Sequence, residues 1–233
     1  ALPPTVVLDL AEEIPAEKIE ANRGPIQSTR LVSQTAGPAA PRYVEADSTS
    51  QVQGGGAVTL TSVDDPANAV GFDSEIAIGA DGFPVISYQD GTASTLKVAK
   101  CVNAACTGIA TITVVDDPLV NLVGGFTSIA IGSDGRPVIS YYDYTAKALK
   151  VASCVNPQCT GIATITTVDD PANDVGQYSS IAIGSDGRPV ISYFDETALA
   201  LRAAKCANAQ CTAAATISVI DDSSAYVGTW STI

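Results

Sequence analysis

The stretch SDGRPVISYYD, at Ser133–Asp143, decides the fold because the chain repeats it. It returns as SDGRPVISYFD at Ser185–Asp195 and, in looser form, as ADGFPVISYQD at Ala80–Asp90. The motif Ile-Ala-Ile-Gly precedes each copy and begins at Ile76, Ile129 and Ile181, with spacings of 53 and 52 residues. A fixed self-similarity at a period of about 50 residues indicates a repeat architecture.

Each repeat contains four strand-like runs. In the unit that spans 126–170, these runs are FTSIAIG, RPVISYYD, ALKVASC and IATITTVDD. Gly, Asp, Asn and Pro stand at the breaks between runs, as tight turns require. Four short antiparallel strands per repeat describe one propeller blade, whereas a parallel β-helix would need shorter coils. We therefore predict an all-β, β-propeller-like array of four-stranded antiparallel blades, each of about 52–53 residues.

The repeats divide the chain into two parts. Residues 1–56 share nothing with the repeat and predict an N-terminal extended arm or linker, in which TVVLDL at Thr5–Leu10 is a candidate strand. Residues 57–233 hold the blades, with whole units near 71–118, 124–171 and 176–223 and partial strands at 57–63 and 227–233. Propellers need about four blades, so we expect an incomplete ring in this chain. Either later blades of a longer product or other copies of the chain would complete it.

The pattern SIAIGSDGRPVISYYD…ALKVASC resembles a repeat of secreted and cell-surface β-propeller proteins of bacteria and archaea. Their repeat reads roughly S-I-A-x-x-x-x-G-x-P-x-I-S-Y-Y-D…L-K-x-A. The resemblance covers about residues 57–233 and implies a propeller fold, but no single activity. Many members place His after the Pro, whereas this chain has Val85, Val138 and Val190, so any role of that His is absent.

The six cysteines form three Cys-x4-Cys pairs that bracket the turn between the third and fourth strands of each repeat. The pairs are Cys101/Cys106, Cys154/Cys159 and Cys206/Cys211. Two Cys that face each other across a tight hairpin lie at disulfide distance. Zinc is the alternative, but it would need four ligands from one neighbourhood, and the chain has no His. We predict three disulfides and therefore a secreted or cell-surface protein.

Composition narrows the partners. The net charge of −13 repels phosphate backbones and disfavours nucleic acid. No run of about 18 apolar residues occurs, so no membrane-spanning segment is predicted. The chain contains no Met, which favours a processed chain or part of a longer product.

The residues that usually carry catalysis are scarce. Without His there is no Ser-His-Asp or Cys-His arrangement. Paired carboxylates can hydrolyse sugars, but Glu75 and Glu196, the only Glu residues inside the repeats, stand at non-equivalent positions. The sequence therefore predicts that the protein is not an enzyme and has no cofactor. Calcium stays as an alternative at Asp90, Asp143 and Asp195, whose other interpretation is turn chemistry.

Aromatic residues recur with the repeat. Tyr88, Tyr141 and Tyr193 stand at matching places, and Trp230, the only Trp, replaces Tyr178 of the preceding copy. Core packing is one interpretation of these rings, and a stacking platform for glycans is the other.

These observations favour a non-enzymatic extracellular structural protein. In this hypothesis, disulfide-stapled propellers self-associate into a surface layer, filament or adhesive assembly, and the N-terminal arm pairs with a neighbouring subunit. The expected partners are other copies of the chain. One alternative is a glycan-binding, lectin-like propeller module. A second alternative is a fragment of a larger secreted propeller hydrolase.

Overall fold

The computed structural model describes residues 6–7, 33–34, 60–65, 67, 69–170, 173–223 and 227–233. The chain divides into two compact units, Ala1–Thr61 and Ser62–Ile233. In the first unit the described residues form one short antiparallel pair, β1 (Val6–Val7) and β2 (Ser33–Gln34). The rest of the predicted N-terminal arm at 1–56 lies outside the described residues, and so does its expected pairing with a neighbouring subunit.

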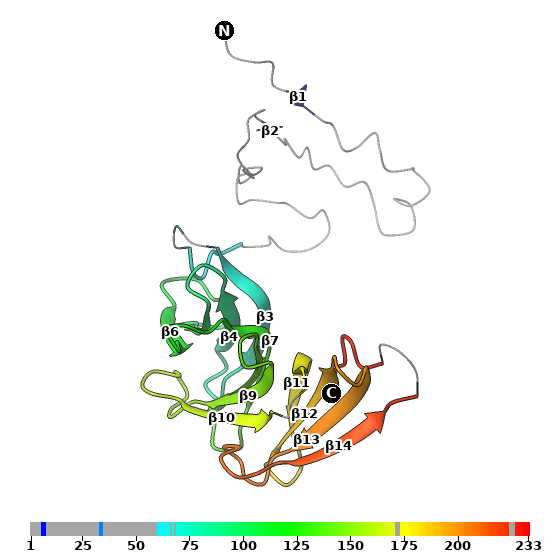
Figure 1. Ribbon diagram of the computed structural model, residues 1–233. Helices are drawn as coiled ribbons and strands as arrows, with labels where there is room; N and C mark the ends of the chain where they lie inside the picture. The colour runs from blue at the N-terminus through cyan, green and yellow to red at the C-terminus, as the bar shows by residue number, and fades with distance from the viewer. Residues whose placement is uncertain are drawn as a thin grey trace, which may run out of the picture. The chain divides into compact units, whose positions relative to one another are not determined.

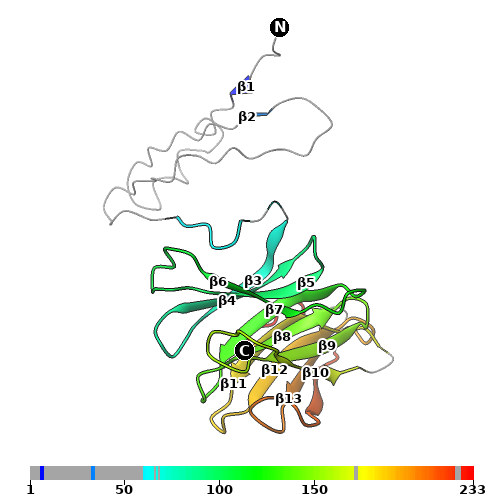
Figure 2. The same ribbon diagram turned by 90° about the vertical axis from the view of Figure 1, so that its left-hand side faces the viewer.

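The second unit is an array of three four-stranded antiparallel blades, as predicted. Each blade takes its strands in chain order, so the first strand lies at one edge and the fourth at the other. The strands are β3 (Val70–Ile78), β4 (Pro84–Asp90), β5 (Thr95–Lys100), β6 (Thr111–Asp116), β7 (Val123–Ile131), β8 (Pro137–Asp143), β9 (Ala148–Ser153), β10 (Thr164–Asp169), β11 (Val175–Ile183), β12 (Pro189–Asp195), β13 (Ala200–Lys205) and β14 (Thr216–Asp221). The described blades do not close a ring, and the second blade lies between the first and the third (Figures 1 and 2). The described part of the chain has no helix that could cross a bilayer.

The repeated eleven residues form the first turn and the second strand of each blade. In the second blade, the Gly135 N–H donates to the carbonyl of Gly132 at 2.9 Å, and the Asp134 carboxylate accepts the Arg136 N–H at 3.1 Å. Gly135 has φ +77°, a conformation that favours glycine. The strand that follows, β8, is buried along its whole length, which explains its apolar residues on both faces.

The core lies between successive blades. Val85, Leu96 and Val98 of the first blade are fully buried and pack in one cluster with Ile129 and Tyr141 of the second. The next junction repeats this cluster with the matching residues Val138, Leu149, Val151, Ile181 and Tyr193. The similar copies therefore build matching interfaces at the two junctions.

A glycine lets the first strand of the second and third blades pack closely against the backbone of the preceding blade. A Cβ added to Gly124 would lie 3.0 Å from the Cα of Leu96, and one added to Gly176 would lie 2.7 Å from the Cα of Leu149. Gly228 stands in the same relation to Leu201, at 2.8 Å. The predicted partial strand at 227–233 therefore occupies the place of a fourth inner strand, although it forms no strand pairs there.

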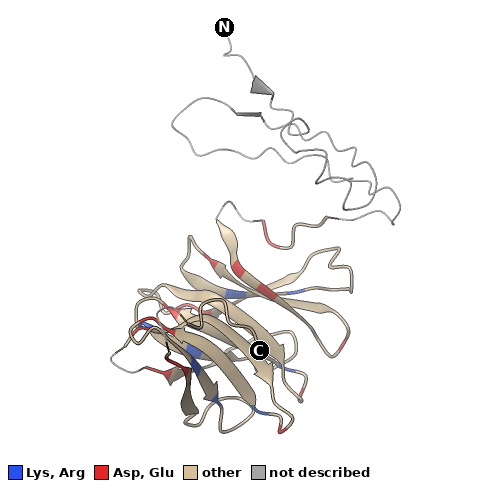
Figure 3. Ribbon diagram, turned by 90° about the vertical axis from the view of Figure 1, so that its right-hand side faces the viewer, with Lys and Arg blue, Asp and Glu red and all other residues tan. Residues whose placement is uncertain are grey.

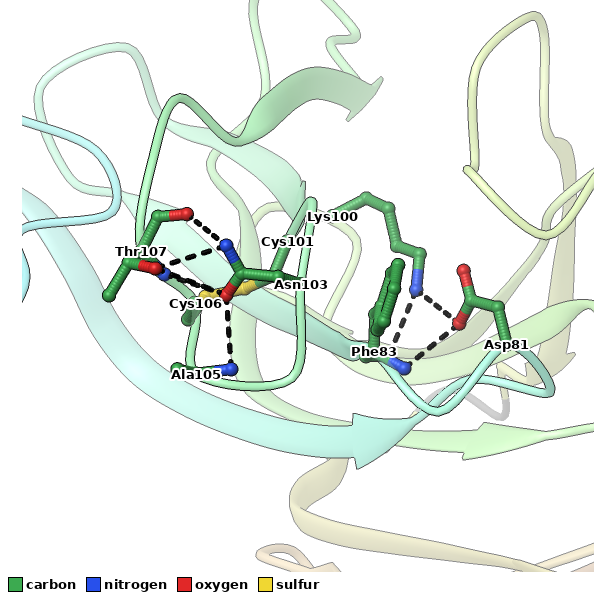
Figure 4. Close-up of a disulfide and its surroundings, with 8 residues drawn as sticks. All are labelled: Asp81, Phe83, Lys100, Cys101, Asn103, Ala105, Cys106 and Thr107. Carbon is green, nitrogen blue, oxygen red and sulfur yellow. Dashed lines mark hydrogen bonds and ion pairs between the residues drawn. A yellow bond between two sulfur atoms is a disulfide. The ribbon is translucent and has the colours of Figure 1, made fainter.

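Each hairpin between the third and fourth strands carries a disulfide, as predicted. The bonds are Cys101–Cys106, Cys154–Cys159 and Cys206–Cys211, with Cα–Cα distances of 5.0, 4.9 and 5.0 Å. In the first blade, the Asn103 side chain folds over the loop and accepts the N–H groups of Ala105 and Thr107 (Figure 4). Asn156 and Asn208 accept the N–H of Thr160 and of Thr212 in the same way. The disulfides indicate an oxidising environment.

Candidate functional site

The three recurring tyrosines belong to the core. Tyr88, Tyr141 and Tyr193 are 3% exposed or less. Their hydroxyls donate to the carboxylates of Asp64, Asp116 and Asp169, each at 2.6 Å. Each Asp ends the strand or segment that precedes the blade of its tyrosine. Of the two interpretations of these tyrosines, core packing fits the structure and a glycan platform does not, because both the ring and the hydroxyl join blades.

The surroundings of these tyrosines keep them protonated. Burial of the ring, followed by the nearby carboxylate of Asp116, raises the pKa of Tyr141 far above its ordinary value. Burial and the bond to Asp169 raise the pKa of Tyr193 in the same direction. A protonated hydroxyl is what a hydrogen bond to a carboxylate requires.

The three calcium candidates already have partners. One oxygen of Asp143 accepts the N–H groups of Thr145 and Ala146, and the other lies 2.6 Å from the Lys150 ammonium. Asp90 pairs with Lys97 at 2.7 Å, and Asp195 pairs with Arg202 at 2.6 Å. Although burial alone raises it, the hydrogen bond from Lys97 holds the pKa of Asp90 below its usual range. The turn interpretation therefore accounts for these carboxylates, and the described residues contain no group of three or more acids or cysteines that could hold a metal.

An open hollow of about 310 Å³ lies over the inner strands β3, β7 and β11. Each repeat contributes three consecutive residues to it. They are Asp73, Ser74 and Glu75, then Phe126, Thr127 and Ser128, then Tyr178, Ser179 and Ser180, and finally Trp230, Ser231 and Thr232. The hollow is thus lined by hydroxyls, aromatic rings and two carboxylates.

One residue per repeat in this lining has a left-handed backbone. The φ angles of Asp73, Phe126, Tyr178 and Trp230 are 50°, 49°, 53° and 59°. The inner strands shift register against their neighbours at this point, so a bulge interrupts each strand. Because bulky residues rarely adopt positive φ, three aromatic residues at this position are unusual.

The three aromatic residues form a continuous row, which we call the aromatic row (Phe126, Tyr178 and Trp230). The ring centroids of Phe126 and Tyr178 lie 4.4 Å apart, and those of Tyr178 and Trp230 lie 4.8 Å apart. Trp230, at one end, is 80% exposed. At the other end, Asp73 accepts the N–H of Phe126 at 2.9 Å. An exposed indole and two half-buried rings beside hydroxyls and carboxylates suit a ligand that is itself both flat and polar.

The sequence identified one member of the aromatic row and missed the rest. Trp230 was a candidate because it replaces Tyr178. A further step of one repeat reaches Phe126, and another reaches Asp73, so the periodicity could have found the whole column. Recurrence alone does not separate buried rings, such as those of Tyr88, Tyr141 and Tyr193, from the more exposed rings of the aromatic row.

Comparisons with known proteins concern the fold. No protein-family model matches the sequence, and no curated protein matches it. The resemblance to the secreted repeat proteins therefore stays a prediction.

Several solved structures resemble the chain in part. One is a protein of unknown function from Dyadobacter fermentans, at 16% identity and a TM-score of 0.49, over 63% of this chain and 41% of that one. Another is a thermostable family-43 glycoside hydrolase, at 11% identity and a TM-score of 0.46, over 68% of this chain and 55% of that one. A third is an exo-β-1,3-galactanase from Phanerochaete chrysosporium, at 12% identity and a TM-score of 0.43, over 64% of this chain and 36% of that one. The chain thus spans between 36% and 55% of the length of these solved chains.

These structures correct one prediction. The sequence predicted that the protein is not an enzyme, on the grounds of absent His and of Glu residues at non-equivalent positions of the repeat. Family-43 glycoside hydrolases are among the proteins with similar folds, so that prediction is wrong in treating such an array as non-enzymatic. At identities of 11–16% the likeness concerns the fold alone and assigns no reaction to this chain.

Proposed function

We propose that this protein is an extracellular carbohydrate-binding β-propeller module and that the aromatic row is its binding surface. The observation that carries the proposal is the row itself, three rings in contact within a polar hollow, with Trp230 80% exposed. A single exposed aromatic side chain needs no explanation, but a contiguous row that ends in an exposed indole indicates a contact surface.

The chemistry of the lining fits a sugar. A sugar ring presents C–H groups on its faces and hydroxyls at its rim. The aromatic row offers apolar faces to the former, and the carboxylates of Asp73 and Glu75 offer acceptors to the latter. The volume of about 310 Å³ lies at the lower end of the range of about 300–1,000 Å³ for ligand pockets, which fits one or two sugar units rather than a long chain.

The test uses Trp230 as its own reporter. Because Trp230 is the only Trp, a change in intrinsic fluorescence on titration with oligosaccharides reports on this site alone. A glycan array selects the probe, and calorimetry measures its affinity for the wild-type chain and for Trp230→Ala and Tyr178→Ala. We expect roughly tenfold weaker binding for each, the equivalent of about 1.4 kcal/mol.

Phe72→Ala is the matched control, because Phe72 is an exposed aromatic residue outside the lining of the hollow. Its affinity should equal that of the wild type. Absence of any glycan ligand, or equal affinity of Trp230→Ala and the wild type, would contradict the proposal.

A second candidate function is glycoside hydrolysis, favoured by the presence of two carboxylates, Asp73 and Glu75, in the same hollow. Hydrolases of this kind use one carboxylic acid to protonate the leaving oxygen and a second carboxylate as nucleophile or base. The oligosaccharides that bind are assayed for new reducing ends with the wild type, Asp73→Asn and Glu75→Gln. Binding without turnover leaves the binding module as the function.

A further inference from the structure

The first blade presents an apolar face that the other blades bury. Ile129 and Ile181, which open the repeat motif in the second and third blades, are each 6% exposed because the preceding blade covers them. Ile76 is the matching residue of the first blade and is 57% exposed. Ile78 on the same strand is 60% exposed, and Ile112, in the same row of paired residues but on β6 at the other edge of the blade, is 36% exposed. We call Ile76, Ile78 and Ile112 the leading face.

The third blade carries the opposite half of the same interface. Val85, Leu96 and Val98 of the first blade are fully buried under the second blade. Their counterparts in the third blade are Val190, Leu201 and Ala203, which we call the trailing face, and all three are partly exposed. One molecule therefore holds both halves of an interface that it builds twice internally.

Two short segments occupy these faces in part. Residues 227–233 lie on the trailing face, where the Ile233 N–H donates to Ser180 at 3.2 Å, as the Ile181 N–H does to Ser128. Their sequence VGTWSTI aligns with VGFDSEI at Val70–Ile76 of the first inner strand. At the leading face, Asp64 accepts the hydroxyl of Tyr88, as Asp116 does for Tyr141. Asp221 ends the third blade in the position of Asp116 and is partly exposed.

We propose that a second copy of this chain docks its leading face on the trailing face of the first. In this exchange, β3 of the second copy replaces residues 227–233, and Asp221 of the first copy replaces Asp64 as the acceptor for Tyr88. The partner is a second copy because the two internal junctions already show that these faces fit each other. The choice of partner thus rests on the match between these faces and the internal junctions, and not only on their apolar character.

In the proposed dimer the same contact is made reciprocally. Three blades from each of two copies give six, within the range of four to eight blades that propellers use. A head-to-tail contact that closes gives a defined oligomer rather than a fibre. The proposed assembly is therefore a closed dimer with two identical junctions.

The exchange affects the aromatic row. In the dimer, Asp73 of the second copy stands where Trp230 stands in the monomer, because both occupy the same position of the repeat. A ligand that stacks on Trp230 and the docking of a second copy therefore compete. The docking proposal does not depend on that ligand.

The experiment measures the mass of the whole chain in solution by light scattering and sedimentation equilibrium over a wide range of concentration. We expect a transition from the chain mass of 23.7 kDa to twice that mass. The variant Ile76→Glu with Ile78→Glu should stay monomeric. Ile109→Glu is the control, because Ile109 is 92% exposed in a hairpin loop and its counterpart Ile162 stays 92% exposed beside a blade junction. The control should dimerise as the wild type does.

A chain that ends at Ser223 lacks the segment on the trailing face and should dimerise at lower concentration than the wild type. Circular dichroism establishes that each variant is folded. A wild type that stays monomeric at all concentrations, or a leading-face variant that dimerises normally, overturns the proposal. So does open polymerisation without a dimer, and so does native protein of greater mass whose own residues cover the leading face.

Discussion

The hydroxyl of Tyr141 joins two blades, because it reaches across the junction to the carboxylate of Asp116 at 2.6 Å. The same bond recurs at Tyr88 and Tyr193. A hydrogen bond to a charged acceptor contributes more than one between neutral groups. Asp64, Asp116 and Asp169, each followed by a second Asp, are therefore hydrogen-bond acceptors for the blade that follows them.

Replacement of Tyr141 by Phe should lower the free energy of unfolding by about 1.5–3 kcal/mol, because it removes a charge-assisted bond and leaves Asp116 without that donor. Urea denaturation followed by circular dichroism measures the loss. Tyr144→Phe is the matched control, since the Tyr144 ring packs on Phe126 and Tyr142 while its hydroxyl makes no bond within the described chain. An equal effect of the two substitutions would show that the hydrogen bond from Tyr141 to Asp116 contributes nothing specific.

The same tyrosines predict a loss of stability at high pH. Burial and the neighbouring carboxylate raise the pKa of Tyr141 in the folded state, so the folded chain holds this proton more tightly than the unfolded chain. The stabilisation is present below the unfolded pKa of about 10 and is lost as the pH rises above it, by up to about 1.4 kcal/mol per pH unit for Tyr141. Urea midpoints measured on both sides of that pH test this, and Tyr141→Phe should show a shallower dependence. A midpoint that stays constant would contradict the assignment.

The sequence could not distinguish these roles of the aromatic residues. Tyr141 and Tyr178 are both aromatic, both periodic and both on strands, yet one is buried and the other lines the hollow. Tyr141 lies on the second strand of its blade, which is buried along its whole length, whereas Tyr178 lies on a first strand at a register shift, with φ 53°. A shift of that kind depends on the neighbouring strand and has no local sequence signal.

The strands and hairpins, by contrast, follow from local sequence. The run ALKVASC predicts a third strand and β9 is Ala148–Ser153, because alternation and turn residues act within a few positions. The cysteine pairs were equally predictable, since a tight hairpin fixes their separation. The role of Asn103, which accepts two N–H groups inside the loop, was missed, although Asn at the same point of every loop was a signal.

Loss of one disulfide should therefore lower the free energy of unfolding only modestly, with effects confined to its hairpin. Cys154→Ser with Cys159→Ser removes a loop closed by a sequence separation of 5 residues. In the chain-entropy model a loop this short contributes about 2 kcal/mol, and the hydrogen bonds of Asn156 still hold the turn. Thermal unfolding of this double variant and of Cys206→Ser with Cys211→Ser should give similar losses. A variant that fails to fold would show that the hairpin depends on the bond and not on Asn156.

At the scale of the molecule, the repeat explains which residues form the interfaces between blades, but not which of those residues stay exposed. Alignment places Ile76, Ile129 and Ile181 in one column, and only the structure shows that the first has no blade against it. The exposure of a residue in the first or last blade depends on whether another blade packs against it. That is why the leading face was absent from the sequence prediction, although an open array was expected.

Charge acts over the whole molecule and predicts which sugars bind. The chain carries a net charge of −13, and acidic residues lie along all three blades (Figure 3). The hollow itself, as far as the described residues line it, has Asp73 and Glu75 and neither Lys nor Arg.

An oligosaccharide that carries uronic acids should thus bind at least about tenfold more weakly than a neutral one of equal length at low salt, because like charges repel across the site. The difference should shrink as salt rises, since the screening length falls to about 10 Å at 0.1 M. In Asp73→Asn with Glu75→Gln, it should largely disappear, while the neutral sugar keeps its stacking on the aromatic row. If the uronate binds as tightly as the neutral sugar in the wild type, the ligand contacts lie away from these carboxylates, and the row must be engaged from its Trp230 end.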